Sequence, residues 1–129
     1  MIFIDASFII GLMNKKDQWH DKALDLVDFC EKKEKFTSNL VITEILNSVG
    51  TYIGGKGGKL LYDNLKDNYT IYDENREIYD LAIYTFRHFN GNIGFADCVS
   101  IEIMKKHNIN QIVSFDSDFD KIKGIKRIF

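Results

Sequence analysis

Two short, mostly apolar segments, each ending in an aspartate, constrain the fold of this chain most strongly. Met1–Asp5 has four apolar residues before its carboxylate, and Ile112–Asp116 has nearly the same form. Both segments are too short for a buried helix, and unbroken apolar runs are typical of parallel strands covered on both faces. The two segments therefore predict two buried parallel strands.

Between these segments the spacing of the apolar residues is helical. Helices are expected over Trp19–Lys33, Leu40–Val49, Lys59–Lys66, Glu74–Phe89 and Ala96–His107. Further short strands are expected over Lys35–Ser38, Tyr69–Tyr72 and Lys126–Phe129. Strands that alternate with helices indicate an α/β fold in which helices cover both faces of a sheet. The chain has no proline, internal repeat or low-complexity linker, so we expect residues 1–129 to form one domain.

A group of glycines predicts a flexible break between two of these helices. It consists of Gly50, Gly54, Gly55, Gly57 and Gly58. Its spacing imitates a phosphate-binding P-loop, but Gly57 occupies the position that requires a serine or threonine. The segment also follows a helix rather than a strand, so we do not expect it to cradle a nucleotide.

Composition limits the classes of function. The formal net charge of −2 argues against a protein that coats nucleic acid by bulk electrostatics. A basic cluster near the C-terminus is either a local binding surface or a solvated one: Lys121, Lys123, Lys126 and Arg127. No apolar run approaches the roughly 20 residues needed to cross a bilayer, and Met1–Asp5 does not resemble a signal peptide. We expect a cytoplasmic protein in which Cys30 and Cys98 are reduced thiols.

Asp5 and Asp116 each stand where a predicted strand ends. In open parallel sheets, ligands bind beyond the carboxyl ends of the strands, so both side chains are expected in that region. A single aspartate in such a place is as often a helix cap or a turn residue. Two aspartates in matching contexts favour a functional site.

Asp97 is predicted to lie on the apolar side of its helix. Ile101 and Met104 follow it at helical spacing and share its face. Glu102 differs, because two lysines follow it three and four residues later, which predicts a solvated, salt-bridged face. A capping or first-turn role is the alternative for Asp97.

Glu44 lies within Leu40–Leu46, a segment that is apolar almost all round. A buried carboxylate without a partner costs several kcal/mol or becomes protonated. No basic residue lies within one helical turn, so Glu44 either belongs to a functional site, pairs with a distant basic residue, or is simply exposed.

Four acids in one pocket require a cation. Two carboxylates ~4 Å apart repel each other by about 4 kcal/mol at an effective dielectric near 20. Oxygen ligands favour Mg²⁺ or Mn²⁺, whereas the scattered His20, His88 and His107 make a poor zinc site. An EF-hand is also a poor match, because Lys121 replaces its obligatory glycine and Arg127 stands where its bidentate glutamate belongs.

Four fragments, in order, resemble the PIN-domain ribonucleases, in particular the VapC-like toxins of toxin–antitoxin pairs. They are Ile4-Asp5-Ala6-Ser7, Thr37-Ser38-Asn39-Leu40 leading into Glu44, Gly94-Phe95-Ala96-Asp97, and Ile112 to Phe119. The resemblance covers essentially the whole chain. It implies a three-layer α/β/α sandwich around a central parallel sheet, and metal-dependent hydrolysis of RNA phosphodiester bonds with Mg²⁺ or Mn²⁺.

By this resemblance, Asp5, Glu44 and Asp97 are the principal catalytic and metal-binding acids, and Asp116 is the fourth. Two serines, Ser7 and Ser114, match positions where the family carries a hydroxyl group near the metal or phosphate, with a turn or capping role as the alternative for each. Asp118 would replace Asp116 if the alignment were shifted by two residues, although helix capping is the simpler role.

The resemblance also implies partners, namely an RNA substrate, an antitoxin protein and a second copy of the chain in a homodimer. Two alternatives stay open, a housekeeping RNA-processing nuclease and a PIN-like module that binds RNA or protein without cutting. A phosphatase of the haloacid dehalogenase type is disfavoured, because Ser7 stands where that chemistry needs a second aspartate.

Overall fold

The computed structural model describes residues 1–129 and contains one five-stranded sheet in which all strands are parallel. The strands are β1 (Ile2–Ile4), β2 (Lys35–Ser38), β3 (Thr70–Tyr72), β4 (Gln111–Val113) and β5 (Lys126–Ile128). Their order across the sheet is β3-β2-β1-β4-β5. The two segments that end in aspartate therefore form the neighbouring strands β1 and β4 at its centre.

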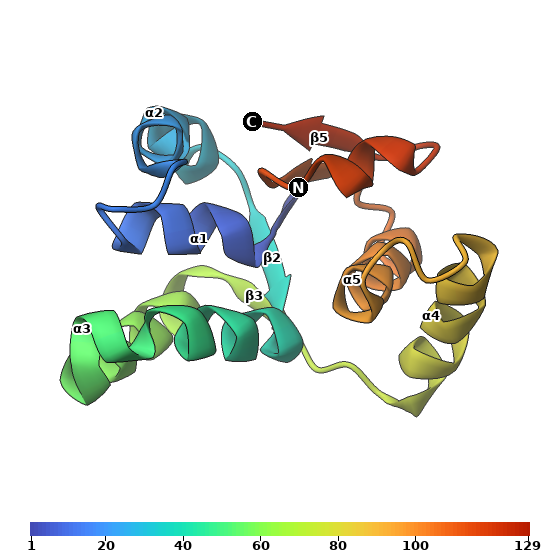
Figure 1. The fold of residues 1–129 in the computed structure, drawn as a ribbon, viewed down its shortest axis with the longest axis horizontal. Helices are drawn as coiled ribbons and strands as arrows, with labels where there is room; N and C mark the ends of the chain where they lie inside the picture. Colours follow the sequence, from blue (N-terminus) through green and yellow to red (C-terminus); the bar gives the residue numbers. More distant parts are fainter.

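Helices cover both faces of the sheet, as Figure 1 shows. One face carries α1 (Ala6–Met13), α2 (His20–Glu31) and α3 (Asn39–Asn68), and the other carries α4 (Arg76–His88) and α5 (Phe95–Lys106). A short 3-10 helix, η1 (Ser117–Lys121), follows β4. The predicted α/β/α sandwich with a central parallel sheet is confirmed. No helix is long and apolar enough to span a membrane.

The apolar side chains of the two central strands of the sheet are completely buried. Ile2, Phe3 and Ile4 of β1 and Ile112 and Val113 of β4 are fully buried. Each such side chain contributes about 1.5–3 kcal/mol by leaving water. Ile4 lies opposite Val113, so the two strands end together and their following residues meet at the carboxyl edge.

Helix α1 was not predicted from the sequence. Its residues are apolar on nearly every side, so they show no helical period, and Phe8 and Ile9 are buried. Helix α1 packs against both α2 and α3. A helix that is enclosed all round carries little amphipathic signal.

The predicted glycine break is a sharp turn within α3. Gly54 has φ +75° and ψ 173°, which are not helical values, and the two halves of α3 run back alongside each other (Figure 1). Glycine is needed there because a side chain is strained at this φ. The first half begins after Ser38, whose hydroxyl accepts a hydrogen bond from the Val41 amide at 3.2 Å.

Glu102 is not on a solvated face as expected. Its side chain is only 11 % exposed and accepts a hydrogen bond from the Thr85 hydroxyl at 3.1 Å, which links α5 to α4. Lys105 reaches it at 3.4 Å, whereas the Lys106 ammonium lies 5.8 Å from the centre of the Tyr72 ring. The predicted ion pair with Lys105 is present, but the predicted solvation of Glu102 is wrong, because sequence spacing does not show the neighbouring helix.

Candidate active site

Asp5 lies at the carboxyl end of β1 and is almost completely buried. Its carboxylate accepts hydrogen bonds from Ser114 Oγ at 2.6 Å and from Ser7 Oγ at 2.9 Å. Asp5 occupies the N-cap position of α1, yet its side chain makes no capping bond with that helix. These two serines therefore fix the orientation of a carboxylate that local capping does not use.

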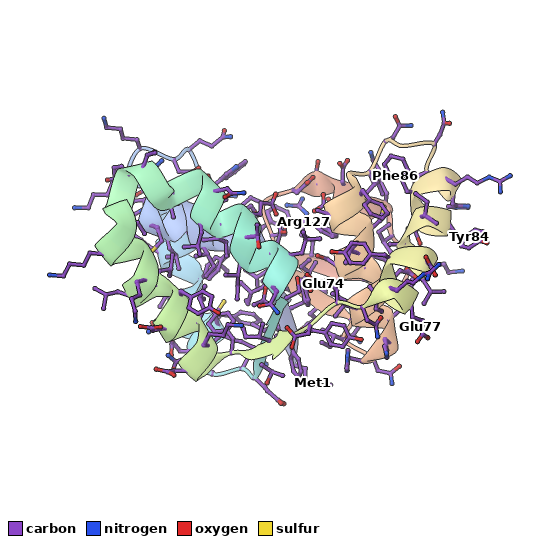
Figure 2. All side chains as sticks on the ribbon, turned by 90° about the horizontal axis from the view of Figure 1, so that it is seen from below. Met1, Glu74, Glu77, Tyr84, Phe86 and Arg127 are labelled. Carbon is purple, nitrogen blue, oxygen red and sulfur yellow. The ribbon has the colours of Figure 1, made fainter.

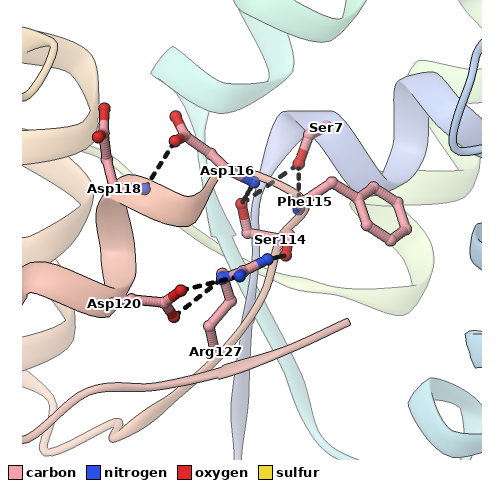
Figure 3. Close-up of polar contacts among 7 residues, drawn as sticks. All are labelled: Ser7, Ser114, Phe115, Asp116, Asp118, Asp120 and Arg127. Atoms are coloured by element: carbon pink, nitrogen blue, oxygen red, sulfur yellow. Dashed lines mark hydrogen bonds and ion pairs between the residues drawn. The ribbon is translucent and has the colours of Figure 1, made fainter.

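The same two hydroxyls hold the chain where it leaves β4 (Figure 3). Ser7 Oγ accepts from the Phe115 amide at 3.0 Å, and Ser114 Oγ accepts from the Asp116 amide at 3.0 Å. Asp116 in turn caps η1 by accepting from the Asp118 amide at 2.9 Å. The two serines thus connect Asp5, which follows β1, to Asp116, which lies three residues after the end of β4.

Two more acids approach from helices on opposite faces of the sheet. Asp97 lies in the first turn of α5 and is half-buried, while Ile101 and Met104 on its side of the helix are fully buried. Glu44 lies in the first half of α3 and is exposed. Of the alternatives that the sequence left open for Glu44, pairing with a distant basic residue is not observed, and the side chain is exposed because its neighbours form the buried side of the helix.

The four acids are near enough to influence one another's charge. Burial, followed by the charges of Asp5 and Asp116, raises the pKa of Asp97 to about 8. Partial burial and the same two charges raise the pKa of Glu44, and burial raises the pKa of Asp5. We call the four residues Asp5, Glu44, Asp97 and Asp116 the acidic pocket.

No lysine, arginine or histidine forms an ion pair with any member of the acidic pocket. As the side chains are placed, no group of three or more acids, histidines or cysteines is tight enough to hold a metal ion. The donors nevertheless fit a hard divalent cation, because they are all carboxylates and their charge has no protein counterpart. A cation between them would offset the mutual repulsion that, after burial, raises the pKa of Asp97 and of Glu44.

Asp118 does not belong to the acidic pocket. Its carboxylate forms an ion pair with Lys121 at 2.8 Å, and it contributes to none of the pKa shifts of Asp5, Glu44 and Asp97. It is not a capping residue either, because Asp116 caps η1. This geometry disfavours the alignment shifted by two residues.

The basic cluster near the C-terminus is partly neutralised. Arg127 binds Asp120 through two nitrogens, at 2.9 and 2.8 Å, and Lys121 forms an ion pair with Asp118. Arg127 also donates to the Ser114 carbonyl at 3.4 Å from behind the site (Figure 3). This support was not predicted, because the sequence does not show that β5 lies beside β4.

The comparisons with known proteins agree with this architecture. The family model of the PIN domain matches residues 2–125. Among solved structures, the chain resembles VapC20 of Mycobacterium tuberculosis, a toxin that cleaves the sarcin–ricin loop, with a TM-score of 0.81 and 25% identity over 94% of each chain. No curated protein sequence matches the chain.

Two more distant structures share the fold. One is a toxin–antitoxin complex from Klebsiella pneumoniae, with a TM-score of 0.76 and 12% identity over 98% of this chain and 96% of the other. The second is VapBC2 from Rickettsia felis bound to a promoter DNA fragment, with a TM-score of 0.72 and 16% identity over 99% and 98%. From the match along nearly its whole length, the chain belongs to the PIN domain family.

Proposed function

We propose that this protein is a divalent-metal-dependent endoribonuclease. The observation that carries the proposal is the acidic pocket, in which four carboxylates without a basic partner lie at the carboxyl edge of a PIN-domain sheet. Such an arrangement is electrostatically unfavourable by itself and suits a site that takes up a cation.

Asp5, Glu44, Asp97 and Asp116 would hold Mg²⁺ or Mn²⁺. A divalent ion there would lower the pKa of water and stabilise the charge that develops on the phosphate oxygens. Ser7 and Ser114 are positioning residues, because both hydroxyls donate hydrogen bonds to the Asp5 carboxylate and fix its orientation.

The proposed reaction is hydrolysis. The oxygen of water bonds to phosphorus while the bond from phosphorus to the 3′-oxygen breaks, and the leaving oxygen takes up a proton. The products then carry a 5′-phosphate and a 3′-hydroxyl. Attack by the ribose 2′-hydroxyl would instead produce a cyclic phosphate, so analysis of the product ends distinguishes the two routes.

A cleavage assay tests the proposal. Purified protein is incubated with total RNA and with a labelled single-stranded RNA, in Mg²⁺, in Mn²⁺ and in EDTA. We expect cleavage that requires metal and that falls about tenfold or more in Asp97→Asn, which removes a carboxylate that would bind the metal. Asp25→Asn is the matched control, because Asp25 is an exposed acid on α2.

No cleavage of any RNA by folded protein would contradict the nuclease proposal and favour a module that binds without cutting. Cleavage that persists in Asp97→Asn would mean that the acidic pocket is not the active site.

We also propose that the nuclease is the toxin of a toxin–antitoxin pair and that an antitoxin protein holds it inactive. The support is the likeness to VapC20 and to toxin–antitoxin complexes. Co-expression with the product of the adjacent gene should relieve growth arrest caused by the wild type. Asp97→Asn alone should cause no arrest; growth arrest by this variant would contradict the toxin proposal.

We also propose that two copies of the chain form a homodimer. Helix α4 exposes Leu81, Ile83 and Tyr84, and Figure 2 shows Tyr84 on its outer side, away from Phe86. Exposed apolar residues on one helix are typical of a protein interface. Light scattering should give twice the chain mass for the wild type and the monomer mass for Tyr84→Lys; a monomeric wild type would contradict the proposal.

A cytoplasmic location is proposed as well. RNA is the expected substrate, and neither Cys30 nor Cys98 forms a disulfide.

A further inference from the structure

An open surface cavity of about 470 Å³ lies beside the acidic pocket, between the first half of α3 and the start of α5. Its lining consists of Leu40, Thr43, Glu44, Asn47, Ser48 and Ala96. Glu44 is one of the four acids, and Ala96 immediately precedes Asp97. The cavity therefore adjoins the place where a phosphodiester would be cut, and its size is within the roughly 300–1,000 Å³ of small-ligand sites.

The charge of the lining excludes a phosphate as the preferred occupant. None of the six residues is basic, and Glu44 carries the only ionisable side chain among them. In the metal-free protein a phosphate here would be repelled by Glu44 and by the neighbouring acids, and no residue of the lining is basic. The cavity suits a neutral ligand.

The lining offers apolar surface and free hydrogen-bonding groups together. Leu40 and Ala96 supply the apolar surface, and the side chains of Asn47 and Ser48 make no hydrogen bond within the protein. The Asn47 amide has both donors and an acceptor. The hydroxyl of Thr43 is already used, because it donates to the Asn39 carbonyl at 2.9 Å.

A nucleobase matches this combination, because its faces are apolar and its edge carries adjacent donors and acceptors. Proteins that select single-stranded RNA commonly bind unstacked bases through their faces and edges. We propose that this cavity binds one base of the RNA next to the cut and that the Asn47 amide reads its edge. The proposal rests on the proposed ribonuclease function and assigns Asn47 as a specificity residue.

The test is a nuclear magnetic resonance titration of the full labelled chain in EDTA. The probes are adenosine, guanosine, cytidine and uridine, with ribose and inorganic phosphate as controls. We expect at least one nucleoside to shift the Asn47 side-chain amide and the Leu40 methyl signals, while ribose and phosphate leave them in place. Asn47→Ala should weaken this binding about tenfold or more, as monitored on the Leu40 methyls.

Asn64→Ala is the matched control, because Asn64 is exposed on the second half of α3 and lies outside the cavity. It should bind nucleosides as the wild type does. The proposal is overturned if no nucleoside shifts these signals, if ribose or phosphate shifts them equally, or if Asn47→Ala binds unchanged. These titrations need neither metal nor cleavage, so their failure and a failure of the ribonuclease assay are observed separately.

Discussion

At the scale of single residues, Ser114 is the buried hydroxyl on which the site depends most. Its Oγ donates to Asp5 at 2.6 Å and accepts from the Asp116 amide at 3.0 Å. One side chain therefore fixes two members of the acidic pocket. Ser114 is 0 % exposed, so water has no access to the hydrogen bonds that its hydroxyl makes.

We expect Ser114→Ala to lower the free energy of unfolding by about 1–3 kcal/mol, because it leaves a buried carboxylate and a backbone amide without their partner. Urea denaturation measures the change. Ser117→Ala is the control, since Ser117 is exposed, and it should stay within about 0.5 kcal/mol of the wild type. Equal stability of Ser114→Ala and the wild type would contradict the bridging role of Ser114.

Asp97 should make the stability of the metal-free protein depend on pH. Its pKa is 3.8 in the unfolded reference and about 8 in the folded protein, because burial and the neighbouring acids disfavour its charge. Between these values the folded state binds a proton that the unfolded state has released. Stability therefore decreases as pH rises through this window, by up to about 1.4 kcal/mol per pH unit for one proton.

Denaturation in EDTA from pH 5 to pH 8.5 should show this decrease in the wild type and in the control Asp25→Asn. The slope should be smaller in Asp97→Asn, whose amide does not titrate. Parallel curves for all three proteins would show that Asp97 does not carry the raised pKa.

The sequence predicted some residue environments and not others. The placement of Asp97 beside Ile101 and Met104 followed from helical spacing, which is a local property. The surroundings of Glu44 and Glu102 did not, because they depend on which helix packs alongside. The pairing of Arg127 with Asp120 could not be predicted for the same reason, because the spacing of residues along the chain does not reveal the order of the strands in the sheet.

At the scale of elements, the turn within α3 depends on one residue. Gly54 has φ +75°, whereas its neighbours on both sides are helical. The turn reverses the chain and so brings the second half of α3 back beside the first, where Gly58 lies near Leu46.

Gly54→Ala should destabilise the protein by about 1 kcal/mol or more, because alanine is strained at this φ. Gly50→Ala is the control, and its effect on stability should have the opposite sign. Gly50 is helical with free space around it, so alanine there should stabilise by about 0.5–1 kcal/mol. Thermal unfolding distinguishes the two, and stabilisation by Gly54→Ala would contradict the strained geometry.

Most elements were predictable because their apolar period is strong. The structure has β1, β2, β3, β5 and four of the five helices where the sequence predicts them. Strand β4 ends at Val113, three residues before Asp116, which caps η1 instead. Helix α1 was missed, since its eight residues are apolar on nearly every side. The glycine group predicted a break, but only the backbone angles identify Gly54 as the turning point.

At the scale of the whole molecule, the net charge of −2 conceals an uneven distribution. The acids at the carboxyl edge of the sheet lack basic partners, whereas Lys59, Lys105, Lys121 and Arg127 are paired elsewhere with other acids. The fold brings acids without basic partners together where four elements meet. This concentration is the basis on which we propose a metal-dependent site there.

Binding of Mn²⁺, measured by electron paramagnetic resonance of the free ion, tests this account most directly. The wild type and Asp25→Asn should remove Mn²⁺ from solution with equal affinity, and Asp97→Asn should bind at least about tenfold more weakly, because a ligand charge is lost. Equal binding by the wild type and Asp97→Asn, or no binding by the folded wild type, would contradict the claim that the acidic pocket holds a divalent cation.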